Sequence, residues 1–264
     1  MARYDIITFD CYGTLIDWES GIAGAFLRAA AAEGVTLDRD DVLRAYAELE
    51  RGVEAEVYRS YREILRETAT RVAHILGWPL APENAGFLGE SVPSWQPFAD
   101  TNPALERLVA AGCRLGILSN IDDDFLAATR KHITVDLDLI VTAQQVRSYK
   151  PGHAHFLTAR ERIGNARWLH AAESNFHDIV PTNALGIDNA WINRLREQPL
   201  PGGTPTYAFN DLTGLADAIV GEQASLIRDR GEPHGSAPPT PPCVRIRTRR
   251  FGWLNTSAVE LLKA

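Results

Sequence analysis

Short apolar segments alternate with longer amphipathic patterns along most of the chain. The first segment, 4–9, is rich in β-branched and aromatic residues and ends at Asp10 and a turn at Gly13. This pattern predicts a buried strand that runs into a loop. From 22 to 78 apolar residues recur at helical spacing, with one helical segment predicted over 41–67 after capping residues.

Beyond Asn102 the two patterns alternate regularly. Strands are predicted at 114–119, 137–142, 168–172 and 189–192, with helices at 103–111, 122–132, 153–163 and 183–185, the last of these the end of a short helix. Strands that alternate with helices predict an α/β fold, with a parallel sheet covered on both faces. Ligands of such sheets bind beyond the carboxyl ends of the strands. The polar residues predicted to lie there are Asp10, Ser119, Asn120, Lys150, Ser174 and Asn175.

Composition narrows the class of protein. The 264 residues are 45% hydrophobic and 23% charged, as in an ordinary globular protein, and the net charge of -7 argues against a nucleic-acid or anionic-membrane partner. No apolar run approaches the roughly 18 residues of a membrane span, and the N-terminus enters a strand pattern without a signal peptide. The three cysteines, Cys11, Cys113 and Cys243, predict neither a disulfide framework nor a zinc site, and favour a cytoplasmic location.

Asp10 is the first candidate for chemistry. A carboxylate directly after an apolar strand can act as a nucleophile that forms an ester or an acyl phosphate. A turn or helix cap is the alternative role for such a residue. The surrounding residues decide between these interpretations.

Four motifs occur in a fixed order, each at a predicted strand end or in the loop after it. They are Phe-Asp-x-Tyr-Gly-Thr-Leu-x-Asp from Phe9, Leu-Ser-Asn from Leu118, Lys150-Pro151, and Ser-Asn-x-x-Asp from Ser174. Together they resemble the motifs of the haloacid dehalogenase superfamily over 4–220. The resemblance implies a Rossmann-like parallel sheet core with an inserted helical cap, and an active site between them. We therefore expect a core at 1–16 and 97–222, a cap at 17–96, and a Pro-rich, disordered linker and tail at 223–264.

Two positions favour the dehalogenase branch, and the chain resembles the type II L-2-haloacid dehalogenases. Phosphatases of the superfamily carry a second Asp two residues after the nucleophile, which protonates the leaving alkoxide. Here Tyr12 stands in that place, and a halide leaves without a proton. Ser174 and Asn175 replace the acidic pair with which phosphatases hold Mg²⁺, so no metal and no cofactor are expected. Glu173 departs from this pattern and leaves a carboxylate that could restore a metal site.

The resemblance also implies a role for each site residue. Asp10 would be the nucleophile, Thr14 would hydrogen-bond it, and Lys150 would keep it ionised. Asp178 would position or activate the hydrolytic water, within the catalytic motif that also contains Ser174 and Asn175. Tyr12 would lie at the substrate, with Ser119 at its carboxylate and Asn120 near the departing halide. For Ser119, Asn120 and Asp178, helix capping is the alternative role.

A cap arginine would bind halide, and Arg44 is the candidate, with Arg51, Arg59 and Arg62 as rivals. Two further positions depart from the family pattern. Phe156 stands where the family has a tyrosine, and His177 where it has a tryptophan.

The predicted reaction is hydrolysis of a short 2-haloacid to a 2-hydroxy acid through an aspartyl ester. The small molecule would be the partner, and the resemblance implies that the chain can form a homodimer. One alternative is a Mg²⁺-dependent phosphatase of the same superfamily acting on a small metabolite, and another is a binding protein without activity. The intact Asp10 and Lys150 argue against the latter.

Overall fold

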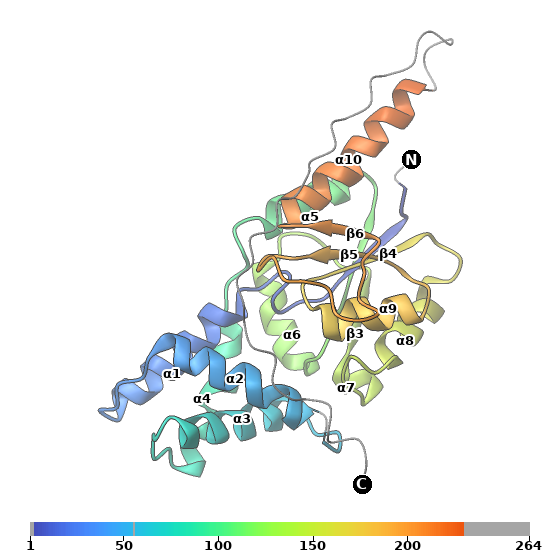
Figure 1. The fold of residues 1–264 in the computed structure, drawn as a ribbon. Coiled ribbons are helices and arrows are strands. Elements are labelled where there is room, and N and C mark those ends of the chain that lie inside the picture. The colour runs from blue at the N-terminus through green and yellow to red at the C-terminus, as the bar shows by residue number, and fades with distance from the viewer. Residues whose placement is uncertain (1–2, 55, 230–264) are drawn as a thin grey trace. The chain divides into compact units, whose positions relative to one another are not determined.

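A six-stranded parallel sheet forms the centre of the fold (Figure 1). The computed structural model describes residues 3–54 and 56–229, which belong to one compact unit. The strands are β1 (Ile6–Phe9), β2 (Arg114–Ser119), β3 (Leu139–Thr142), β4 (Trp168–Ala172), β5 (Asp188–Ile192) and β6 (Tyr207–Phe209), and their spatial order is β3-β2-β1-β4-β5-β6. This is the strand order of a doubly wound Rossmann-type sheet. The chain changes direction between β1 and β4, where the carboxyl ends of the strands open a crevice.

Side chains from the two faces of the sheet enter two separate clusters. Ile7 and Phe9 of β1 belong to a cluster that includes residues of α5 (Thr101–Ala110), α6 (Asp123–Thr129) and α10 (Leu212–Asp229). Ile6 belongs to a smaller cluster with residues of α8 (Ala154–Ile163). Successive residues of a strand point to opposite faces, so burial of both sets requires helices on both sides. The predicted α/β class is confirmed.

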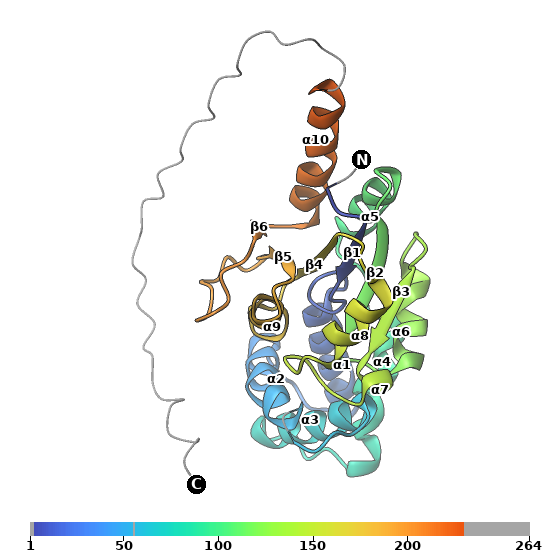
Figure 2. The same cartoon turned by 90° about the vertical axis from the view of Figure 1, so that its right-hand side faces the viewer.

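Between β1 and α5 the chain forms a group of helices. These are α1 (Trp18–Ala32), α2 (Arg39–Glu54), α3 (Tyr61–Ile75), η1 (Pro82–Gly86), α4 (Phe87–Ser91) and η2 (Val92–Ser94). In both ribbon views α1 to α4 gather beyond the carboxyl ends of the strands (Figures 1 and 2). The remaining short elements are η3 (Arg130–His132), α7 (Ala143–Val146), η4 (Asn175–Ile179) and α9 (Val180–Ala184). The helical cap expected from the resemblance is thus present over the crevice.

Some elements differ from the sequence prediction. The helical segment expected over 41–67 is two helices, and α3 begins afresh with a capping box in which Ser60 and Glu63 satisfy each other's backbone N–H groups. Neither β6 nor α10 was expected. Because α10 continues to Asp229, residues 223–229 are helical, and the rest of the predicted tail lies outside the described residues. No helix between residues 3 and 229 has the length and apolar character needed to span a bilayer.

Hydrogen bonds connect the cap to the core near the start of α3. The Asp122 carboxylate, which follows β2, accepts from the backbone N–H groups of Tyr61 and Arg62, both at 2.9 Å. The Tyr149 hydroxyl donates to the carbonyl of Arg59 at 2.8 Å. A carboxylate at a helix N-terminus satisfies otherwise unpaired donors and opposes the helix dipole. These bonds fix α3, and with it the neighbouring α2, above the sheet.

We expect Gly21→Ala to lower the free energy of unfolding. A Cβ at Gly21 in α1 would lie 2.5 Å from the ring of buried Trp95. Such overpacking costs about 1–3 kcal/mol, which exceeds the gain of about 1 kcal/mol from replacing a helical glycine. Chemical denaturation measures the difference. Gly24→Ala is the matched control, because its Cβ would meet only the flexible Arg28 side chain, and this variant should be more stable. Equal stabilisation of both variants would contradict the prediction.

Candidate active site

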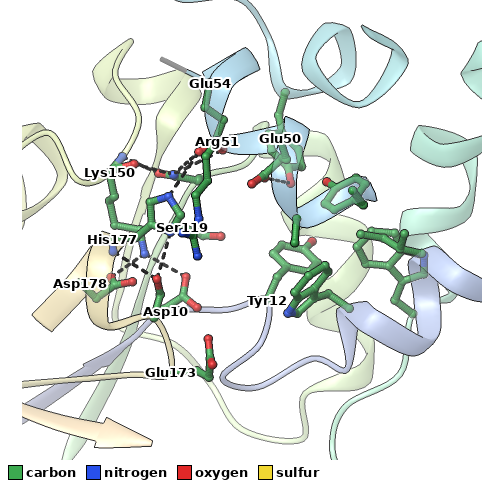
Figure 3. A pocket seen from close by; sticks show the side chains of 18 residues that line it. Asp10, Tyr12, Glu50, Arg51, Glu54, Ser119, Lys150, Glu173, His177 and Asp178 are labelled. Carbon is green, nitrogen blue, oxygen red and sulfur yellow. Dashed lines mark hydrogen bonds and ion pairs between the residues drawn. The ribbon is translucent and has the colours of Figure 1, made fainter. Parts of the chain in front are cut away.

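A cavity of about 160 Å³ lies between α2 and the carboxyl ends of β1, β2 and β4 (Figure 3). An apolar cavity of about 150 Å³ holds one benzene, so this space suits a molecule of six or seven heavy atoms. The core contributes mainly polar residues to its wall, namely Asp10, Ser119, Asn120, Lys150, Glu173, Ser174, His177 and Asp178. From the helical insertion come Trp18, Ile22, Tyr46, Ala47, Glu50, Arg51, Glu54, Tyr61 and Trp95, and Tyr12 completes the wall.

Asp10 follows β1 and is 7% exposed. Its Oδ2 accepts from the Thr14 hydroxyl at 2.9 Å and its Oδ1 from Lys150 Nζ at 2.9 Å. Thr14 in turn accepts from the backbone N–H of Glu173 at 2.9 Å, which directs the Thr14 proton to Asp10. Burial raises the pKa of Asp10, and Lys150 and Thr14 oppose that rise. The carboxylate is therefore held in one orientation by two donors.

Lys150 is buried, and its ammonium group uses all three of its protons. Beside Asp10 it donates to Asp178 Oδ1 at 2.6 Å and to the Leu118 carbonyl at 3.0 Å. Burial alone would lower the pKa of Lys150, but the two carboxylates outweigh it and raise the pKa. Asn120 holds the Lys150 backbone, accepting from its N–H at 2.7 Å and donating to its carbonyl at 3.1 Å. Lys150 is thus a fixed positive charge between two carboxylates.

Asp178 lies in η4 and is completely buried. Burial opposes ionisation, but Lys150 and His170 outweigh it and lower the pKa of Asp178 to about 2. His170 Nε2 lies 2.9 Å from Asp178 Oδ1, and its Nδ1 lies 2.8 Å from Thr8 Oγ1. The Thr8 hydroxyl accepts from Trp168 Nε1 at 2.7 Å and so has its proton free for Nδ1, which leaves the Nε2 proton for Asp178. His170 is not among the site residues predicted from the sequence, although a histidine in a predicted buried strand was a usable signal.

Ser119 and Asp178 each have a polar atom without a hydrogen-bond partner among the described residues. These atoms are Ser119 Oγ and Asp178 Oδ2, and both residues line the cavity. Buried polar atoms without protein partners are uncommon and call for a ligand or water. Both atoms are also closed to solvent, so a bound molecule or water reaches them only if neighbouring side chains move.

Ser174 and Asn175 differ in placement. Ser174 lines the cavity and caps η4, where its hydroxyl accepts from the His177 N–H at 3.1 Å. Asn175 is absent from the cavity wall, and its amide instead bonds the Gly203 carbonyl at 2.8 Å and the Leu200 N–H at 3.1 Å. The structure therefore places Asn175 as a support for the loop before β6 and not among the groups that face the cavity.

Arg44 does not reach the cavity. Its side chain is 71% exposed and pairs with Asp41 at 2.7 Å, because it lies on the solvent side of α2. Of the rival arginines, Arg51 lines the cavity wall. The expected placement of Arg44 at the site is corrected accordingly.

Tyr12 stands at the position by which the sequence favoured a dehalogenase over a phosphatase. Its ring lines the cavity and makes an edge contact with Trp95, with ring centres 5.8 Å apart. Its hydroxyl lies 2.7 Å from Thr129 Oγ1. Burial raises the pKa of Tyr12 well above its usual range, so the group is neutral and turned to a partner outside the cavity.

Three further carboxyl groups line the cavity. Burial raises the pKa of Glu50 to about 7 and that of Glu173 to about 8, and raises that of Glu54 well above its usual range. Sequence reasoning had noted only Glu173. Residues 3–54 and 56–229 contain no group of three His, Cys, Asp or Glu side chains arranged to hold a metal ion.

Comparison with known proteins places the chain among hydrolases. The sequence model of the haloacid dehalogenase-like hydrolase family matches residues 4–175. The chain is 26% identical over 217 residues to (S)-2-haloacid dehalogenase 4A of Burkholderia cepacia, across 80% of this chain and 90% of that protein. It is 27% identical over 236 residues to an (S)-2-haloacid dehalogenase of Pseudomonas putida, across 83% and 98% of the two proteins.

A solved structure agrees with this at the level of the fold. The L-2-haloacid dehalogenase from Xanthobacter autotrophicus superposes with a TM-score of 0.70 at 18% identity, covering 83% of this chain and 99% of that one.

Proposed function

The chain belongs to the haloacid dehalogenase-like hydrolase family, and we propose that it hydrolyses short 2-haloacids to 2-hydroxy acids. The observation that carries the proposal is the pairing of Asp10 with Lys150 at the cavity, with neutral Tyr12 where a leaving-group acid would stand. The relatives named as (S)-2-haloacid dehalogenases support the same reaction. The cavity volume suits the six heavy atoms of 2-chloropropanoate.

In the first step an Asp10 oxygen attacks the carbon that carries the halogen. The new C–O bond forms as the C–halogen bond breaks, its electron pair leaves with the halide, and the carbon inverts. We assign the substrate carboxylate to Ser119, which lines the cavity and whose hydroxyl has no partner among the described residues. Lys150 holds Asp10 ionised against the effect of burial.

In the second step water attacks the carbonyl carbon of the Asp10 ester. Lys150 and Thr14 lie at the Asp10 oxygens, where they stabilise the negative charge of the tetrahedral intermediate. Asp178 Oδ2 orients the water and accepts its proton as the bond forms. With a pKa of about 2, Asp178 is a weak base, so orientation is its larger contribution. The products are a 2-hydroxy acid, halide and a proton.

A single turnover in ¹⁸O-water tests the covalent route. With enzyme in excess over 2-chloropropanoate, the label should enter Asp10 and the first product should be unlabelled. This follows because the oxygen of the product comes from Asp10, whereas direct attack by water would label the product at once. Mass spectrometry of the product and of the peptide that contains Asp10 gives the result. A parallel reaction with a metal chelator should proceed at the same rate. Labelled first product, or activity that requires added Mg²⁺, would overturn the proposal.

Two expectations concern the whole protein. The proposed location is the cytoplasm, which suits the free thiols of Cys11 and Cys113. The homodimer implied by the family resemblance also stays a prediction, and sedimentation analysis tests it.

A further inference from the structure

A row of three hydrogen bonds crosses the sheet beneath the site, and the reaction described above uses only the residue at its end. Trp168 Nε1 lies 2.7 Å from Thr8 Oγ1, which lies 2.8 Å from His170 Nδ1. On the other side of the ring, His170 Nε2 lies 2.9 Å from Asp178 Oδ1. Thr8 of β1 stands opposite His170 of β4, and both are completely buried. The row ends at the carboxylate that lies beside Lys150 in Figure 3.

Each bond in this row has one direction. An indole N–H only donates, so the Thr8 oxygen accepts from Trp168. Within residues 3–54 and 56–229 the Thr8 hydroxyl proton has no acceptor besides His170 Nδ1, and a doubly protonated ring would leave that proton without a partner. Nδ1 is therefore an acceptor, and the proton of the neutral ring is on Nε2. The row holds His170 as a hydrogen-bond donor to Asp178.

The Asp178 carboxylate receives donors from two different parts of the core, and both go to Oδ1. Lys150 donates at 2.6 Å from the segment between α7 and α8, and His170 donates at 2.9 Å from β4. The terminal torsion of an aspartate has a broad, roughly two-fold preference, so one ammonium partner alone allows either oxygen to take its place. Two donors on one oxygen fix the carboxyl plane and leave Oδ2 as the oxygen without a partner among the described residues.

The nucleophile does not depend on this arrangement. Asp10 has a neutral donor of its own, Thr14, in addition to Lys150. Within the described part of the chain His170 makes no hydrogen bond to any of these three residues. Each carboxylate thus shares Lys150 with the other and has one private neutral donor, which is Thr14 for Asp10 and His170 for Asp178.

We propose that His170 is a positioning residue for hydrolysis of the Asp10 ester. Its N–H holds Asp178 so that Oδ2 is the oxygen presented to the hydrolytic water, and the ring keeps its proton throughout. Oδ2 is closed to solvent, so Asp178 must keep this orientation while the side chains around it move to admit water. The inference rests on the proposed function and assigns a residue to the second of its two steps. Loss of the His170 donor should therefore slow hydrolysis of the ester and leave its formation nearly unchanged.

Two variants of His170 separate this function from the loss of a buried side chain. An asparagine amide reaches about as far as Nδ1 and a glutamine amide about as far as Nε2, so only Gln can still donate to Asp178. In His170→Asn, kcat for 2-chloropropanoate should fall about 10- to 100-fold, the effect of one hydrogen bond to a charged group. kcat/KM should change little, because cleavage of the carbon–halogen bond is irreversible and kcat/KM reports only the steps up to it. His170→Gln should restore most of kcat.

Detection of the ester locates the slow step. After His170→Asn is mixed with excess 2-chloropropanoate and quenched with acid, mass spectrometry should find the peptide that contains Asp10 largely esterified. Halide should appear in a burst of about one equivalent before the slow phase. His155→Asn is the matched control, because His155 is equally buried but pairs with the Ser119 carbonyl at 3.1 Å. Its ester should not exceed the wild-type level, and unfolding curves correct every rate for the folded fraction.

Three kinetic results would overturn the proposal. They are wild-type kinetics in His170→Asn, equal falls of its kcat and kcat/KM without accumulated ester, and an effect of His170→Gln as large as that of His170→Asn.

The tautomer of His170 gives a readout in the wild-type protein. In ¹⁵N NMR spectra His170 should show a protonated Nε2 and an unprotonated Nδ1, and loss of these signals in His170→Gln identifies them among the seven histidines. A neutral ring with its proton on Nδ1 could not donate to Asp178 and would also overturn the proposal. A wild-type protein with the proton on Nε2 that releases no halide from any 2-haloacid would instead refute the proposed function and leave the hydrogen-bond row standing.

Discussion

Asp10→Asn is expected to lower halide release from 2-chloropropanoate on the order of 10⁴-fold or more. A neutral amide cannot displace the halide to form the ester, and removal of a nucleophile has effects of this size in other hydrolases. The asparagine keeps one acceptor oxygen for the two donors of Asp10, Thr14 and Lys150, so one of these hydrogen bonds is lost while the side chain keeps its size. Initial rates measured by halide release, with unfolding curves for both proteins, give the result.

The matched control is Asp5→Asn on the same segment of chain. Asp5 pairs with Arg167 at 2.6 Å with both side chains largely exposed, and such a pair contributes less than about 1 kcal/mol. Its activity should equal that of the wild type. Mass spectrometry must exclude deamidation of the introduced asparagine back to aspartate. Turnover by an undeamidated Asp10→Asn protein within tenfold of the wild type would remove Asp10 from the role of nucleophile.

Lys150→Met should lower both activity and stability. The substitution leaves the Asp10 and Asp178 carboxylates buried together without a cation. Loss of one partner from a buried ion pair costs about 3–5 kcal/mol. The pKa of Asp10 is already raised by burial, and loss of Lys150 should raise it further, so that the nucleophile becomes protonated near neutral pH. We expect a loss of roughly 10³-fold in kcat at pH 7.

The direction in which the stability of Lys150→Met changes with pH separates loss of the buried positive charge from general misfolding. A carboxyl group whose pKa is raised in the folded state destabilises the fold above its unfolded pKa, near 4. The stability deficit of Lys150→Met should therefore be largest at neutral pH and shrink as the pH falls toward 4. Activity per folded molecule should rise with pH as Asp10 ionises. Lys131→Met, at an exposed lysine, is the control and should change neither quantity. A deficit independent of pH would contradict this account.

The sequence predicts which core residues meet at the site, because these residues stand at or just after the carboxyl ends of strands. Parallel strands place their carboxyl ends at one edge of a sheet, so residues that follow them converge whatever the details of packing. Asp10, Ser119 and Ser174 each follow or end such a strand and line the same cavity. The chemical roles assigned to them remain predictions.

The cap wall could not be anticipated in the same way. Which face of α2 meets the cavity depends on how that helix is rotated above the sheet, and this is set by packing against α3 and by the Asp122 contacts. Because α2 and α3 were predicted as one helical segment, the sequence did not determine which way Arg44 and Glu54 point. Two carboxyl groups one helical turn apart, Glu50 and Glu54, line the cavity together, and that spacing is the signal that was available in the sequence.

Two elements, β6 and α10, were not predicted from the sequence. β6 has three residues and follows a loop rich in proline and glycine, so it carries almost no periodic signal. The register of β6 comes from β5, with Ala190 opposite Tyr207. The first turns of α10 bury Leu212, Leu215 and Ile219, a helical pattern that the sequence analysis passed over.

The ammonium group of Lys150 has no free proton for the substrate until Asp10 has reacted. An ammonium has three protons, and here every one is engaged before substrate arrives. The substrate carboxylate therefore finds no free proton on Lys150 in the ground state and must be bound by other donors of the cavity wall, among which Arg51 carries a charge. Once Asp10 is esterified its oxygen becomes a poorer acceptor, and one proton of Lys150 is released for the charge that develops in hydrolysis. Lys150 therefore has a proton to donate only after the carbon–halogen bond has broken. Its hydrogen bond then stabilises the transition state of ester hydrolysis and not the complex with substrate.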